Sequence, residues 1–267
     1  MSEYTKTGLL LLMIAVGLTL FATPVTYALY STINLEELQG QPFSALMVLM
    51  PIAILGVLVG IFYLLGAILI FCGRKEFGEK HRKYIFYCCI LFCIMLGVIV
   101  LFSFSMVVSS LNLVFNAQSQ NTPVQVDFFK TQVMYSLIQA FIVAVFSGLL
   151  WVLALYNLEN KKGQYILLTA FVFMILTPAV NSIGSLMALD DWVQQGTLNE
   201  MYNGTIPSSS YLQLFSLSQW TGVPGLIMLL CSFMSSLLTL VALFIAYKRI
   251  KNGELIPPPS PNVISPL

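Results

Sequence analysis

Six long stretches of this chain carry no charged residue, and they constrain its fold more than any other feature. They cover residues 7–35, 38–73, 84–126, 131–158, 163–189 and 201–247. Each is longer than the ~20 residues that a helix needs to cross the apolar core of a bilayer. Because lipid offers no partner to backbone N–H and C=O groups, a run that spans it must be helical. We therefore expect helices near residues 8–30, 43–72, 84–115, 131–156, 164–189 and 221–247.

The composition agrees with a membrane protein. Only 9% of the residues are charged and 58% are hydrophobic, with a mean hydropathy of +0.88. Soluble domains carry about a quarter charged residues, so this balance excludes a water-soluble fold. It predicts an all-α polytopic integral membrane protein in which residues 1–250 form one six-helix transmembrane bundle within the lipid bilayer. The apolar run at 8–30 is too long for the core of a signal peptide, so we expect a retained first helix.

Basic residues are sorted to one side of the expected bundle. Eleven of the twelve lysines and arginines fall at the end that holds both termini, and Lys130 alone falls at the other. Basic residues beside membrane helices stay in the cytoplasm, which predicts a multi-pass cell-membrane protein with both termini cytoplasmic. The Pro-rich segment 251–267 is then a cytoplasmic tail, and the long loop 190–220 is external. An Asn-Gly-Thr tripeptide in that loop makes Asn203 a possible N-glycosylation site.

The segment "GRKEFGEKHRKY", residues 73–84, holds the densest group of these cations and the only histidine. We interpret it as a cytoplasmic basic anchor that sets the topology and meets anionic lipid headgroups. A lone His81 among cations is expected to be a solvated side chain, although it could also titrate near neutral pH on a docking surface. The members of the basic anchor are Arg74, Lys75, Lys80, His81, Arg82 and Lys83.

The six expected helices contain no ionisable Asp, Glu, Lys, Arg or His side chain. Such residues inside a membrane usually mark proton relays, ion paths or catalytic sites, so we expect no pump, voltage sensor or enzyme. The sequence has no His-Glu-x-x-His, Gly-x-Ser-x-Gly or phosphate-loop motif, and a single histidine excludes a bis-histidine haem. No catalytic residue, cofactor, metal or nucleic acid is therefore expected. The five cysteines match no metal-binding spacing and are expected to pack as small apolar side chains.

Small residues recur at helical spacing on the second, fourth and sixth expected helices, and on the sixth they are Ser232, Ser236, Ala242 and Ala246. Residues four positions apart share a face, and small ones let two helix backbones approach closely in lipid. Such a ridge packs either within one bundle or against another subunit, and the pattern alone does not choose between them. The ridges are Gly56 and Gly60 on the second helix, and Ser136, Ala140, Ala144 and Gly148 on the fourth.

Neutral polar side chains lie at a similar depth in several helices, in the external third of the membrane. Interhelical hydrogen bonds, each worth about 0.6 kcal/mol, explain such a polar layer. The alternative is an outward-facing pocket for a small neutral ligand or a lipid headgroup, with Gln139 and Asn181 as its most polar groups. The layer comprises Thr23, Ser109, Gln139, Thr177, Asn181 and Ser232.

The basic turn also resembles a known group of proteins. Its Gly-Arg, Glu-Phe-Gly and His positions, from Gly73 to His81, follow "FYLLGAILIF" and precede another long apolar run. In these residues and in the layout of its spans, the chain resembles uncharacterised archaeal multi-pass membrane proteins. The resemblance implies an archaeal cell membrane and carries over no biochemical activity.

Together these features predict a non-catalytic integral membrane protein that serves as an accessory, scaffold or anchoring subunit of a membrane complex. Its partners are then other membrane proteins or further copies of itself. The alternative is a passive carrier or channel-like pathway for a small neutral solute or lipid, lined by Gln139 and Asn181. A lipid-acting enzyme using Asp190, Asp191 and Glu200 is a third hypothesis, but no nucleophile or base accompanies these acids.

Overall fold

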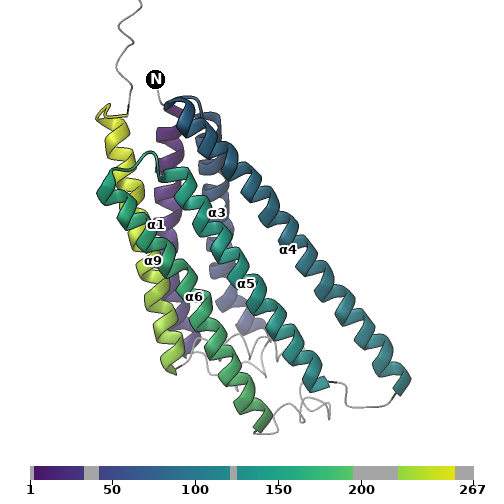
Figure 1. Cartoon of the computed structure of the whole chain (residues 1–267). Helices are drawn as coiled ribbons and strands as arrows, with labels where there is room; N and C mark the ends of the chain where they lie inside the picture. Colours follow the sequence, from purple (N-terminus) through teal and green to yellow (C-terminus); the bar gives the residue numbers. More distant parts are fainter. Residues whose placement is uncertain (1–2, 33–41, 121–124, 195–221, 256–267) are drawn as a thin grey trace, which may run out of the picture.

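Six long helices make up this computed structural model, which describes residues 3–32, 42–120, 125–194 and 222–255 (Figure 1). These residues contain no strand, so the all-α prediction is confirmed. Each helix has a segment long and apolar enough to cross a membrane. The helices are α1 Glu3–Thr32, α3 Pro42–Cys72, α4 Gly78–Gln120, α5 Gln125–Leu155, α6 Lys161–Gln194 and α9 Gly222–Lys251. Asn203, most of the loop 190–220 and residues 256–267 of the tail lie outside the described residues.

All the predicted helices are present, but most extend further than expected. The starts of α4 and α5 each lie six residues before the expected ones, and α4, expected at residue 84, begins at Gly78. Gly78 takes a left-handed backbone conformation (φ 86°), which side chains rarely adopt, and leads the chain directly into the helix. Glu79 then pairs with Arg82 at 3.0 Å, and this spacing stabilises a helical turn. Residues 79–83, expected in a turn, therefore form the start of α4.

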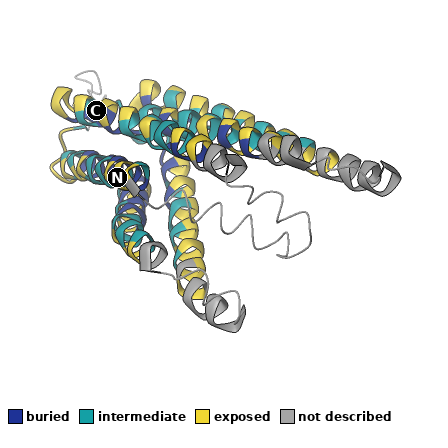
Figure 2. Ribbon diagram, turned by 90° about the horizontal axis from the view of Figure 1, so that it is seen from below, coloured by how far each residue is buried: buried dark blue, intermediate teal, exposed yellow. Residues whose placement is uncertain are grey.

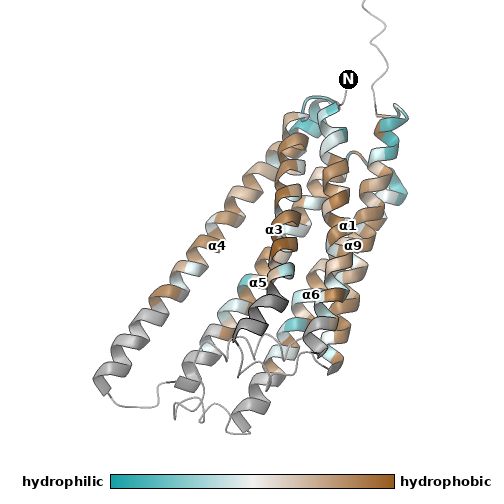
Figure 3. Cartoon of the chain, turned by 180° about the vertical axis from the view of Figure 1, so that it is seen from behind, coloured by the Kyte–Doolittle hydropathy of each residue, from teal (hydrophilic) through white to brown (hydrophobic). Residues whose placement is uncertain are grey.

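The helices form an open row. α3 packs on α1, α1 on α9, α9 on α6, α6 on α5, and α5 on α4. The turn 73–77 joins α3 to α4 at the end that holds the N-terminus, but these two helices share no extensive contact, so the row does not close into a ring. Figures 1 and 3 show α4 leaning away from α3 as both extend from the end that holds the N-terminus. Each edge helix therefore packs on one main neighbour within the described chain.

The buried apolar core lies where α1, α4 and α6 begin and α3, α5 and α9 end. We call this the basic end, because lysines and arginines gather there, and Figure 3 shows hydrophilic residues at this end of the helices. Elsewhere the helices expose large apolar side chains such as Leu101 and Phe104, as surfaces that face lipid do. In Figure 2, exposed residues run along much of each helix. The core comprises Leu9, Leu12, Val16, Ile70, Ile85, Leu155, Leu158, Leu167, Ala242, Leu243, Ala246 and Ile250.

α1 and α3 cross at two glycines, where their backbones nearly touch. A Cβ atom added to Gly8 would lie 2.8 Å from the carbonyl oxygen of Gly66, and one added to Gly66 would lie 2.7 Å from Leu12 Cγ. By contrast, a Cβ atom on Gly56 or Gly60 would meet nothing within 4 Å. The predicted glycine ridge on α3 is therefore open in the described chain, and α3 meets α1 through Gly66 on another face.

Gly8→Ala is expected to lower the thermal stability of the purified protein, because the new methyl group would overlap a backbone oxygen that cannot rotate away. Overpacking of this kind costs about 1–3 kcal/mol. Gly60→Ala is the matched control: its methyl group would enter open space, so the melting temperature should stay the same or rise slightly. Thermal unfolding of both variants in one detergent measures the difference. Equal melting temperatures would contradict the close crossing of α1 and α3.

Candidate functional site

The surface of the basic end is a shell of exposed cations. Its members are Lys75, Lys80, Arg82, Lys83, Lys161, Lys162, Lys248 and Lys251. Arg74 is half-buried, with its guanidinium carbon 4.3 Å from the centroid of the Phe71 ring. Of the predicted basic anchor, the lysines and arginines are thus at or near the surface. A second layer of polar groups lies buried beneath them.

His81 belongs to the buried layer, and the expectation that it is solvated is wrong. The residue is 1% exposed and makes a T-shaped contact with the Phe77 ring, with the ring centroids 5.5 Å apart. Neither ring nitrogen has a hydrogen-bond partner among the described residues. The cause is the early start of α4, which places His81 one turn before the core residue Ile85 and on the same face of the helix.

The turn between α3 and α4 also caps the start of α1. The backbone N–H of Thr5 donates to Glu76 Oε2 at 3.3 Å. This N–H is among the first four of α1, which lack partners within the helix, and a carboxylate there also meets the positive end of the helix dipole. Gly73 permits the contact, because a side chain at this position would overlap the Thr5 hydroxyl. That hydroxyl is buried without a hydrogen-bond partner in the described chain.

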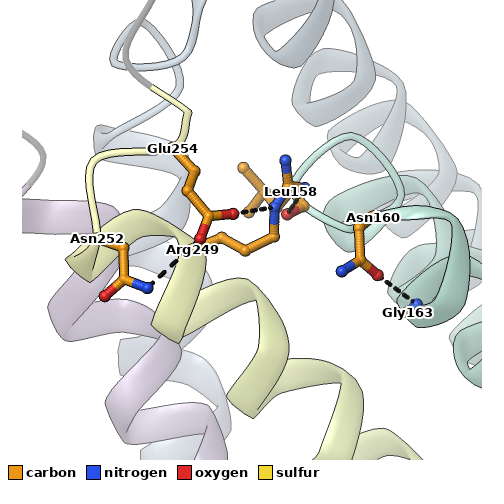
Figure 4. A network of polar contacts seen from close by, with 6 residues as sticks. All are labelled: Leu158, Asn160, Gly163, Arg249, Asn252 and Glu254. Carbon is orange, nitrogen blue, oxygen red and sulfur yellow. Dashed lines mark hydrogen bonds and ion pairs between the residues drawn. The ribbon is translucent and has the colours of Figure 1, made fainter.

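Arg249 ties the end of α9 to the turn between α5 and α6 (Figure 4). Its Nη1 donates to the carbonyl oxygen of Leu158 at 2.8 Å, across 91 positions of sequence. Its Nε pairs with Glu254 Oε2 at 3.2 Å, and Asn252 Nδ2 donates to the other carboxylate oxygen of Glu254 at 3.4 Å. In the same turn, Asn160 Oδ1 accepts from the N–H of Gly163 at 2.8 Å and so caps the start of α6.

The chain folds back after α9 in a short segment, residues 252–255, which we call the C-terminal hook. Gly253 has a φ of 73°, and its N–H donates to the carbonyl of Ile250 at 3.1 Å. The N–H of Glu254 donates to the carbonyl of Arg249 at 3.0 Å. This pair of bonds around a left-handed glycine is the Schellman motif. Leu255 then packs against the core, so the hook is held by both its backbone and its side chains.

Glu159, in the turn between α5 and α6, is a buried acid that forms no ion pair in the described chain. It is 4% exposed, and neither carboxylate oxygen has a hydrogen bond in the part of the chain that the structure describes. Its carboxyl group occupies the space that Gly163 leaves free, because a Cβ atom there would overlap Oε2. Burial raises the pKa of Glu159 to about 8, although the nearby charge of Arg249 and the backbone N–H of Ala246 act to lower it. This carboxyl group is therefore largely protonated at neutral pH.

Reasoning from the sequence did not single out Glu159, although a signal was present. The turn otherwise carries the lysines Lys161 and Lys162, and its acid directly follows the core residue Leu158. Four positions later stands Gly163, which provides the room for a buried side chain. An acid that follows a core leucine and precedes a glycine by one helical turn is a candidate for burial. The sequence does not show that Arg249 lies near it, because this depends on the fold.

The side chains of the expected polar layer do not bond to one another within the described chain. Thr23 and Thr177 donate to carbonyls of their own helices, those of Thr19 at 2.8 Å and Phe173 at 2.9 Å. Gln139 on α5 and Asn181 on α6 are half-buried, as is Ser232 on α9, and the side chains of these three residues make no hydrogen bond within the described ranges. The side chain of Ser109 lies outside the described residues.

The residues of the small-residue ridge on α5 become more buried from its first member to its last. Ser136 and Ala140 are exposed, Ala144 is half-buried and Gly148 is buried. A Cβ atom on Gly148 would overlap the ring of Phe171 on α6. Only this end of the ridge therefore packs closely within the described chain.

Groups that could hold a metal ion are not gathered in the described residues. No three of their His, Cys, Asp and Glu side chains lie together in a way that would suit one. Of the cysteines, Cys231 is buried, as its expected packing role requires, whereas Cys72 and Cys93 are exposed. The candidate site of this protein is therefore the buried polar layer at the basic end.

The raised pKa of Glu159 predicts a pH-dependent stability. Because the folded-state pKa of about 8 lies above the ordinary value of 4.5, the contribution of Glu159 to stability is complete below pH 4.5 and is lost as the pH rises through about 8. Glu159→Gln stays neutral, so its melting temperature should rise relative to the native protein as the pH is raised through this range. Glu79→Gln, at an exposed position, is the control and should show no such trend. A constant difference at all pH values would contradict the burial of an unpaired acid.

Comparisons with protein-family models, with curated proteins and with solved structures found no match to this chain. The residues of the basic end therefore take no role from a relative, and their function has to follow from their own geometry and chemistry.

Proposed function

We propose that this chain is a non-catalytic accessory, scaffold or anchoring subunit of a membrane complex. The observation that carries the proposal is the open row of helices, in which α3 and α4 each pack on one main neighbour. Gly56 and Gly60 lie exposed on α3, and nothing in the described chain lies within 4 Å of a Cβ atom at either position. Small residues one turn apart allow another helix to approach closely. The proposed partner helix docks on this face of α3.

Apolar exposure alone does not support a partner, because lipid covers apolar side chains equally well. What favours a protein partner is the pair of bare glycine positions, where a helix gains van der Waals contact that flexible lipid tails supply less well. The far edge of the row is α4, whose 43 residues make it the longest helix described. At about 1.5 Å per residue it exceeds the thickness of a bilayer core, and α5 is its main neighbour among the described helices.

The native mass of the complex tests this function. The particle is extracted in mild detergent from its own membrane, and we expect the 29.6 kDa chain together with other proteins in a fixed ratio. Gly56→Leu combined with Gly60→Leu should release the partner without lowering the melting temperature of the chain itself, because both positions are open. Gly97→Leu, at an open position on α4, is the matched control and should leave the particle intact.

A particle containing this chain alone would overturn the accessory role. The second candidate function, a passive pathway for a small neutral solute, would then be measured by solute uptake into liposomes. One observation favours it. Gly148 on α5 lies against Phe171 on α6, and in these antiparallel helices this contact places Gln139 and Asn181 at nearly the same depth. Gln139→Leu should then slow uptake.

We further propose that the basic end faces the cytoplasm, as the sorting of lysines and arginines favours, and that the cell is archaeal, as the resemblance at residues 73–81 implies. Cys72 is exposed at the basic end and reports on this orientation. In a variant that keeps Cys72 as its only cysteine, a membrane-impermeant thiol reagent should label it only after the cells are permeabilised. Labelling of intact cells would place the basic end outside and overturn the orientation.

A further inference from the structure

Arg249 pairs with one carboxyl group and lies near a second, because its Nη1 donates to the carbonyl oxygen of Leu158, the residue before Glu159, at 2.8 Å. Its Nε pairs with Glu254 at 3.2 Å, and the Glu254 side chain is 49% exposed. The charge of Arg249 also acts on Glu159, which is 4% exposed and has no hydrogen-bond partner in the described chain. Arg249 is thus already engaged by the exposed acid, while the buried acid beside it lacks a partner.

The charged groups on the elements near this turn form no ion pair with Glu159 in the described chain. At the start of α4, which packs on α5, they are Glu79, Lys80, His81, Arg82 and Lys83. On α9 and in the hook these are Arg249, Lys248, Lys251 and Glu254; at the start of α6 they are Lys161 and Lys162; and on α1, which packs on α9, they are Glu3 and Lys6. The lysines of α6 and α9 are exposed, and Arg249 is the charged side chain that acts on the pKa of Glu159. A change in the charge of Glu159 therefore acts mainly on the guanidinium group of Arg249.

The surroundings of Glu159 suit a proton better than a larger ligand. Its carboxyl group fills the space above Gly163, where even a Cβ atom would overlap it. A metal cation needs several oxygen ligands around it, and no group of three potential metal-binding side chains is found in the described residues. A proton needs no additional room, and it removes the cost of burying an unpaired charge.

We propose that Glu159 is a proton-binding site that controls the C-terminal hook through Arg249. When Glu159 is protonated, Arg249 remains paired with Glu254 and the hook is closed. When Glu159 loses its proton, the buried carboxylate draws the guanidinium away from Glu254 and the hook loosens. An exposed ion pair contributes little to stability, whereas an unpaired buried carboxylate is costly. Once Glu159 is ionised, Arg249 therefore pairs with it rather than with Glu254.

The loosening is confined to the side-chain tie of the hook. Loss of the Arg249–Glu254 pair leaves the Schellman bonds and the packing of Leu255 in place, so residues 252–255 open more often without unfolding α9. The opening of the segment that precedes the Pro-rich tail thereby depends on the pH at the basic end. This inference does not depend on the proposed accessory role.

Hydrogen exchange of the backbone amides of residues 252–255 tests the proposal in the full-length chain. The native protein and Glu159→Gln are compared at the same pH, so that the intrinsic pH dependence of exchange cancels. Below the pKa of about 8 the two should exchange equally. Above it, the native hook should exchange about threefold faster than that of Glu159→Gln, the change expected for one lost exposed ion pair.

Two further variants make the result specific. Glu254→Gln lacks the tie at every pH, so its hook should exchange faster than the native one below the pKa and should show no added response above it. Glu79→Gln removes another exposed acid that pairs with an arginine, Arg82, and should behave as the native protein does. Equal exchange of the native protein and Glu159→Gln above the pKa would overturn the proposal. A pH response that persists in Glu254→Gln would overturn it as well, and this second criterion holds even if Glu159→Gln fails to fold.

Discussion

The core at the basic end is the interaction on which the rest of the structure depends. In lipid, each span satisfies its own backbone hydrogen bonds, so helices form without one another and side-chain packing arranges them. That packing is concentrated around residues such as Leu9 and Leu243, and where Gly8 brings α1 onto Gly66 of α3. Away from the core the row opens, which allows α3 and α4 to be consecutive in the chain and yet stand apart.

Half-buried polar groups at the basic end support this core by making hydrogen bonds to the ends of helices. Glu76 accepts from a free N–H at the start of α1, and Arg249 donates to the carbonyl of Leu158 beyond the end of α5. Helix ends are where backbone groups lack partners, so one side chain there stabilises two segments at once. Glu159 differs, because it shares the layer but has no hydrogen bond. Its protonation is therefore coupled to the arrangement of its neighbours.

The residues of the candidate site show how far prediction from the sequence could reach. Charge in residues 79–83 suggested a turn, whereas Gly78 and an ion pair begin the helix there. This shift of one boundary buries His81, because a helix carries it onto the face of Ile85. Glycine spacing likewise indicated a close contact on α3 but could not indicate which face makes it. Burial of Glu159 was missed because a short turn has no periodicity that would reveal which side faces inward.

By itself, the sequence determined the all-α class, the number of membrane-spanning helices and the sorting of charge between their ends. These follow from the length of the charge-free stretches, compared with the thickness of a bilayer, and from the position of the charges between them. Only the tertiary structure decided the order of the helices in the row, the glycines that meet and the polar groups that are buried. Those features depend on residues distant in the sequence, such as Thr5 and Glu76, 71 positions apart. In lipid every helix face is apolar enough to remain exposed, so hydrophobicity does not choose among faces, and close packing of particular side chains makes the choice.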